Sequence, residues 1–64
     1  MRIDQKIIVH CTDTNKDVEG TVVRIQKGSI DVKISEMSIK LYQKKPGFYV
    51  GNMHGLEFTS LIKL

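Results

Sequence analysis

The sequence predicts an all-β protein, folded as a small barrel or a strongly bent antiparallel sheet of about five to six short strands. Ile and Val fill fourteen of the 64 positions, Leu fills four and Ala none, and β-branched residues favour strands over helices. Apolar and polar residues alternate along most of the chain, which is the pattern of half-buried strands. Turn-forming residues recur at intervals of roughly ten positions, as in small all-β folds.

The first strand is expected over residues 3–11. Its apolar side chains share the odd-numbered positions and predict one buried face: Ile3, Ile7, Val9 and Cys11. Residues 12–17 are all polar, and several of their side chains readily bond their own backbone. We therefore expect a solvated loop after the first strand.

The second strand is expected from about Val18 to Gln26 and carries an irregularity. Val22 breaks the alternation that places Val23 and Ile25 on the inner face. Gly20 inside the strand indicates a bulge, a bend or a close backbone approach, each of which a small curved barrel requires. The following Lys27-Gly28 predicts a tight hairpin.

Alternation is clearest in the third strand, residues 29–35, where Ile30, Val32 and Ile34 face inward. The next inward residues, Met37, Ile39 and Leu41, fall on odd positions. This change of parity requires a short turn at residues 35–36 or a bulge.

The last third of the chain contains two further turns and two short strands. Pro46-Gly47 suits a type II turn that ends the fourth strand, a strand follows at residues 48–50, and residues 51–55 form the next turn. A final strand starts at Leu56, and the apolar tail, residues 61–64, is expected to dock on the core or on a partner. The predicted inner face combines the inward residues of all strands: Ile7, Val9, Val23, Ile25, Ile30, Val32, Ile34, Ile39, Leu41, Val50, Leu56 and Phe58.

Size and composition limit the kind of protein. A chain of 64 residues forms one domain, residues 1–64, with a core so small that pairing with another copy would stabilise it, so we expect a homo-oligomer. Cys11 is the single cysteine and cannot form an internal disulfide, which favours a reducing, cytoplasmic location. No segment resembles a signal peptide or a membrane span, so no membrane association is expected.

The basic charge is concentrated in the middle of the chain. Residues 22–45 carry six basic and two acidic side chains, whereas residues 1–21 have a net charge of −1 and residues 46–64 of zero. Such a stripe can follow a phosphate backbone, and Tyr42 or Tyr49 can stack on a base. We therefore expect a non-enzymatic, regulatory or nucleic-acid-binding module for RNA or DNA, whose phosphate-contacting residues are Arg24, Lys27, Lys33, Lys40, Lys44 and Lys45. The same cations also suit an acidic protein partner, or a solvated face that prevents aggregation of strand edges.

The alternative function is a protein-interaction module that docks through strand edges and exposed apolar side chains. The residues expected at that interface are apolar or aromatic: Tyr42, Phe48, Tyr49, Met53 and Leu61.

No catalytic, metal-binding or cofactor-binding motif is expected. His10 and Cys11 are adjacent, so a regular strand directs them to opposite faces and they cannot act as a base and nucleophile pair. The two histidines and the cysteine lack the spacing of known zinc sites. The sequence therefore predicts that the protein is not an enzyme.

Two stretches resemble known families. Residues 20–32 resemble the strand, turn and strand of small SH3-like barrels, including KOW-type and Sm-like RNA-binding modules. Residues 46–58 are similar to the closing strands of PilZ-type barrels. The nucleotide-binding signatures of the PilZ family, an R-x-x-x-R run and a D/N-x-S-x-x-G motif, are both absent. Arg2 and Arg24 are the only arginines, and no Asp or Asn stands in the spacing of the second motif. This likeness implies an interaction module without cyclic-dinucleotide binding.

Overall fold

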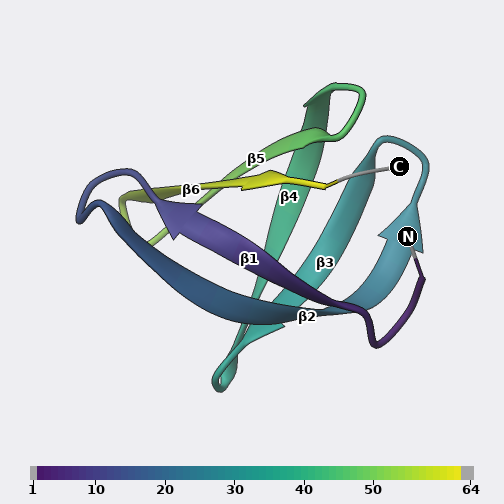
Figure 1. The fold of residues 1–64 in the computed structure, drawn as a ribbon, viewed down its shortest axis with the longest axis horizontal. Helices are drawn as coiled ribbons and strands as arrows, with labels where there is room; N and C mark the ends of the chain where they lie inside the picture. Colours follow the sequence, from purple (N-terminus) through teal and green to yellow (C-terminus); the bar gives the residue numbers. More distant parts are fainter. Residues whose placement is uncertain (1, 63–64) are drawn as a thin grey trace.

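The computed structural model describes residues 2–62 and shows a closed antiparallel barrel in which each strand pairs with the next and β6 returns to β1 (Figure 1). The all-β prediction is confirmed, and the architecture is consistent with a small SH3-like barrel. The described residues contain no helix that is long and apolar enough to cross a membrane. Six strands form the barrel: β1 Lys6–Cys11, β2 Lys16–Gln26, β3 Ser29–Ile34, β4 Met37–Lys45, β5 Phe48–Met53 and β6 Leu56–Leu61.

Short turns join the strands. Pairing of Gln26 with Ser29 and of Ile34 with Met37 leaves only residues 27–28 and 35–36 in the turns, as the sequence predicts. β4 and β5 are longer than expected, because the next two turns contain only residues 46–47 and 54–55. Positive φ angles at Gly28, Gly47 and Gly55 support these reversals, since glycine adopts them at little cost.

β2 bends sharply because its two halves pair with different strands. Residues 16–21 pair with β1, and residues 21–26 pair with β3, so Figure 1 shows the strand curving between them. A Cβ atom at Gly20 would lie 2.5 Å from Cγ1 of Val32. Of the bulge, bend or close approach expected at this glycine, the structure shows a close approach of its backbone to the Val32 side chain, beside the bend of the strand.

The register shift in β2 overturns part of the predicted core. A bulge lies between Val22 and Arg24, and the extra residue of a bulge is left out of the ladder. Val22 is consequently fully buried, whereas Val23 is 39% exposed. Ile25 lies opposite buried Ile30 but is 43% exposed, because β1 pairs with β2 no further than Thr21 and leaves Ile25 a strand neighbour on one side only.

β5 also differs from the prediction. Lys45 pairs with Phe48 across the turn, and Tyr49 then lies opposite buried Ser60. Tyr49 therefore faces inward, while Val50 is only half-buried. The core that results comprises Ile7, Val9, Cys11, Val22, Ile30, Val32, Ile34, Ile39, Leu41, Tyr49, Phe58 and Ile62. Leu56 is half-buried and packs against it.

At the ends of the inner face the predictions were partly right. Met37, expected to face inward, is 40% exposed beside the turn that precedes it. Ile62 docks as expected, since it is buried and its backbone N–H donates to the Gly47 carbonyl at 2.7 Å. Residues 63 and 64 of the expected docking tail lie outside the described residues.

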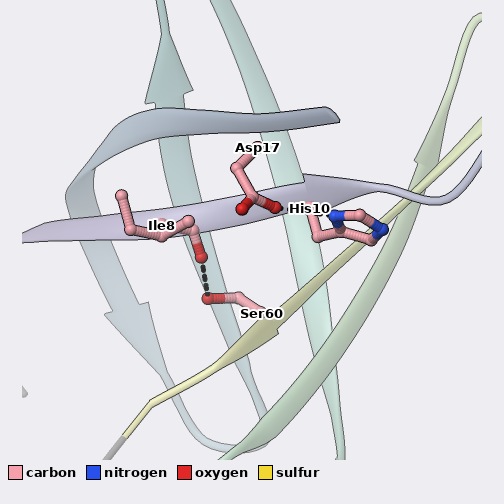
Figure 2. A network of polar contacts seen from close by, with 4 residues as sticks. All are labelled: Ile8, His10, Asp17 and Ser60. Carbon is pink, nitrogen blue, oxygen red and sulfur yellow. Dashed lines mark hydrogen bonds and ion pairs between the residues drawn. The ribbon is translucent and has the colours of Figure 1, made fainter. Parts of the chain in front are cut away.

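The barrel closes incompletely between β1 and β6. Only His10 with Thr59 and Cys11 with Phe58 are paired, and the two strands then diverge in Figure 1. The Ser60 hydroxyl donates a hydrogen bond of 2.9 Å to the Ile8 carbonyl across the gap (Figure 2). A side chain thus replaces the next ladder bond at this seam.

Candidate nucleic-acid interface

Cross-strand pairing brings basic side chains together on the outer face of β2, β3 and β4. Arg24 lies opposite Asp31, and Asp31 lies opposite Lys40. Residues paired across an antiparallel ladder share a face, and so do residues two apart on one strand. Lys33 therefore joins this row from β3, and Tyr42 extends it along β4. Lys44 lies at the register shift between Gln43 and Lys45 of β4 and lines one groove together with Lys40 and Tyr42. We call this set the basic face: Arg24, Lys33, Lys40, Tyr42 and Lys44, all of them exposed.

One groove on the basic face combines cations with an aromatic ring. It has a volume of about 410 Å³ and is lined by Lys40, Tyr42 and Lys44 of β4 together with Val50, Gly51 and Asn52 of β5. The tyrosine is 54% exposed and lies between the two lysines in sequence. Gly51 contributes only backbone, and a Cβ atom there would lie 2.3 Å from the Lys40 carbonyl oxygen. Gly51 lies opposite buried Phe58, so a side chain at position 51 would point toward the core and not into the groove.

The lysines of the groove have no acidic neighbour in its lining. Asp31 is the acidic residue in the row between Arg24 and Lys40, and it is half-buried. Among residues 2–62, Lys6 forms an ion pair with Glu19 at 3.8 Å, and His10 Nδ1 lies 2.6 Å from Asp17 Oδ1. Neither pair involves the basic face, so its charges are available to a ligand.

The other two expected cations flank this face. Lys27 is exposed in the turn after β2, and Lys45 is exposed at the end of β4. The Gln43 backbone N–H donates to the Gly28 carbonyl at 2.9 Å, so the turn that carries Lys27 lies against β4. All six basic residues singled out from the sequence are therefore exposed on or beside β2, β3 and β4.

The apolar residues expected at a protein interface differ in how exposed they are. Tyr42 and Leu61 are exposed at 54% and 82%, and Phe48 and Met53 are half-buried. Tyr49 is only 7% exposed, so the expectation that its ring is accessible was wrong. The turn at Pro46-Gly47 could have indicated this. A two-residue turn fixes the pairing of the strands on either side of it, and that pairing directs residue 48 outward and residue 49 inward.

Sequence reasoning also missed an exposed apolar residue of β1. Ile8 is 57% exposed. The alternation that buries Ile7 and Val9 also directs Ile8 outward, so this signal was present in the sequence but was not used. Val50 and Asn52, which line the groove, were missed for a different reason. Their position depends on the pairing of β4 with β5.

The polar residues near the β1–β2 loop are held by contacts among themselves. His10 Nδ1 lies 2.6 Å from Asp17 Oδ1 (Figure 2), whereas Cys11 is buried in the core. Hydrogen bonds to Thr14 lower the pKa of the Cys11 thiol. Within residues 2–62, no three His, Cys, Asp or Glu side chains are grouped as metal ligands would be.

Comparisons with protein-family models, with curated protein sequences and with solved structures found no match to this chain. The resemblances of residues 20–32 and 46–58 to known barrels therefore rest on their sequence patterns alone. What the protein binds must be inferred from the chemistry of its surface.

Proposed function

We propose that this protein is a non-enzymatic module that binds single-stranded nucleic acid, RNA or DNA, through the basic face. The observation that carries the proposal is the groove in which exposed Tyr42 lies between Lys40 and Lys44. We also propose a cytoplasmic location, because the single cysteine, Cys11, is a buried free thiol.

The ring of Tyr42 favours a single strand over a duplex. Bases in a duplex are stacked on one another, whereas those of a single strand can stack on an aromatic side chain. Such stacking is worth about 1–3 kcal/mol per base and tolerates any base. Tyr42 is the one tyrosine of this chain with an exposed ring, since Tyr49 is in the core, so we expect one stacked base per protein.

The lysines supply a second, salt-dependent contribution. Lys40 and Lys44 are four residues apart on β4, a separation of roughly 13 Å along a strand, and therefore reach different phosphates. Each phosphate neutralised on a single strand steepens the dependence of log affinity on log salt by about 0.7. Lys33 and Arg24 extend the contact across β3 and β2.

Fluorescence anisotropy with labelled oligonucleotides of about ten nucleotides, within the site sizes of single-domain binders, tests the proposal. Lys40→Gln and Lys44→Gln should each weaken binding and each lower the salt slope by about 0.7. Tyr42→Leu should weaken binding about 5- to 150-fold and leave the salt slope unchanged, because it removes stacking and no charge.

Lys16→Gln is the matched control. Lys16 is exposed at the start of β2, opposite Cys11 and outside the groove, and the substitution changes the net charge by the same amount. Binding that Lys16→Gln weakens as much as Lys40→Gln would contradict a localised site. Loss of binding in the lysine variants with no effect of Tyr42→Leu would indicate a ligand recognised by charge alone, such as an acidic protein, and would also contradict the proposal.

A further inference from the structure

The groove beside Tyr42 has two sides of different chemistry. Its β4 side carries Lys40, Tyr42 and Lys44, whereas Asn52 is the one polar side chain on its β5 side. β5 lies between β4 and β6 in the barrel (Figure 1). A ligand in the groove therefore meets cations on one side and an amide on the other.

The Asn52 amide lies near the ring of Tyr42. Tyr42 pairs with Val50, and Asn52 is two residues further along β5, so the side chains of Tyr42 and Asn52 share the outer face. Residues in this diagonal relation are about 7–8 Å apart. Both side chains are exposed, and within residues 2–62 no hydrogen bond engages the Asn52 side chain. The amide is thus available to a base that is stacked on Tyr42.

Carboxylates lie beyond Asn52, on the side away from the lysines. Glu57 of β6 pairs with Asn52 and is exposed on the same face. The Glu57 carboxylate accepts a hydrogen bond of 3.0 Å from the Thr12 hydroxyl, and the Glu57 backbone N–H donates to the Asp13 carboxylate at 2.7 Å. Neither carboxylate is in an ion pair within residues 2–62, so both repel an anion.

These charges orient a nucleotide in the groove. Its phosphates are attracted to the lysines of β4 and repelled by the carboxylates beyond β5. The sugar separates the base from the phosphate, so a base that stacks on Tyr42 extends across the groove toward β5. The edge of that base then faces Asn52, whose amide offers an N–H donor next to a carbonyl acceptor.

We propose that the Asn52 amide reads the base that stacks on Tyr42 and selects adenine; this inference rests on the proposed function. Adenine presents the N6 amino donor next to the N7 acceptor, and an Asn amide bonds to both. At the corresponding edge guanine presents two acceptors, cytosine a donor alone and thymine an acceptor alone. On the Watson–Crick edge, which is also open in a single strand, every base offers a donor beside an acceptor. Adenine is therefore the base that matches the amide by either edge.

Fluorescence anisotropy with labelled DNA strands of about ten nucleotides tests the selection. Three strands contain adenine, cytosine or thymine alone, and in a fourth guanine alternates with thymine. We expect the wild type to bind the adenine strand most tightly. In Asn52→Ala the ratio of adenine-strand to thymine-strand affinity should fall about 5- to 150-fold, the discrimination of one bidentate contact. Because this compares two proteins on the same strands, the stacking of adenines on one another cancels.

Asn52→Ala should leave the salt slope unchanged, because the substitution removes no charge. Asn52 is exposed, so the variant should fold, and an unchanged far-ultraviolet circular dichroism spectrum checks this. Gln43→Ala is the matched control. Gln43 is an exposed amide next to Tyr42 on β4 but lies outside the lining of the groove, so this variant should keep the wild-type ratio.

The outcomes separate this inference from the proposed function. A wild type that binds the strands without favouring adenine would overturn the inference alone. The same holds for a preference that persists in Asn52→Ala, or that Gln43→Ala reduces equally. Failure of all four strands to bind would overturn the proposed function and this inference with it.

Discussion

Gly51→Ala should destabilise the barrel strongly, although it adds only one methyl group. The new Cβ atom would lie 2.3 Å from the Lys40 carbonyl oxygen and 2.7 Å from Cδ2 of Leu41. Real Cβ contacts do not fall below 3.0 Å, so β5 must move away from β4 by about 0.7 Å. The obstructing oxygen belongs to the backbone and cannot rotate aside.

The loss of stability can be worked out from the contacts that this movement of β5 disrupts. Of the nearest ladder pairs, Tyr42 with Val50 and Gln43 with Tyr49, one exchanges two hydrogen bonds, whose net worth is about 0.5–1.5 kcal/mol each. Repacking of fully buried Leu41 adds about 1–3 kcal/mol. A loss of about 2–6 kcal/mol is large for a domain of this size, whose total stability is roughly 3–10 kcal/mol.

Urea and thermal unfolding, followed by far-ultraviolet circular dichroism, measure the effect. We expect the melting temperature of Gly51→Ala to fall by at least about 8 °C, since 1 kcal/mol corresponds to about 4–8 °C in small domains. A melting temperature within about 3 °C of the wild type would refute the close approach of β5 to β4.

Gly55 provides the control for backbone conformation. Nothing lies within 4 Å of a Cβ atom at this position, but its φ is 77°, a left-handed conformation that costs an L-residue about 1–2 kcal/mol. Gly55→Ala should therefore lose about that much, and Gly55→Asn much less, because Asn tolerates this conformation. Equal losses for Gly51→Ala and Gly55→Ala would contradict a steric origin at Gly51.

Three further predictions concern the core and the seam. Val32→Ala, at a position with no exposed surface, should cost about 2–4 kcal/mol, and an unchanged urea midpoint would exclude Val32 from the core. Val22→Thr should cost about 1–3 kcal/mol because it buries a hydroxyl, whereas Val23→Thr should change stability by less than about 0.5 kcal/mol; similar losses would show that the bulge is misplaced. Ser60→Ala should cost about 1–2 kcal/mol, because the Ile8 carbonyl loses its 2.9 Å hydrogen bond, and it should speed amide hydrogen exchange in β1 and β6; unchanged exchange would contradict the bridging role.

Local features of the fold were predictable from the sequence. The inward direction of Ile30, Val32 and Ile34 follows from alternation within one regular strand. The turns at residues 27–28 and 35–36 follow from a glycine in the first and from a change of parity around the second. Each of these inferences depends only on residues close together in the chain.

The directions of the Val22, Val23 and Tyr49 side chains could not be predicted from residues close together in the chain. A bulge adds one residue to β2 and reverses the parity of the residues after it, and composition does not specify which valine is left out of the ladder. Tyr49 and Val50 suit a half-buried strand equally well. Pairing of Lys45 with Phe48, together with the ladder to β6, decides which of the two faces the core.

The candidate site shows the same division. Alternation predicts that Lys40 and Tyr42 lie on the outer face of one strand, and that much the sequence determined by itself, together with the all-β class and most of the core. The position of Lys44 depends on the register shift between Gln43 and Lys45. Only the tertiary structure decided that Val50, Gly51 and Asn52 of β5 lie beside these residues and complete a groove. The physical reason is that alternation is a property of a single strand, whereas a groove depends on the register between strands, which bulges, turn lengths and barrel closure set jointly.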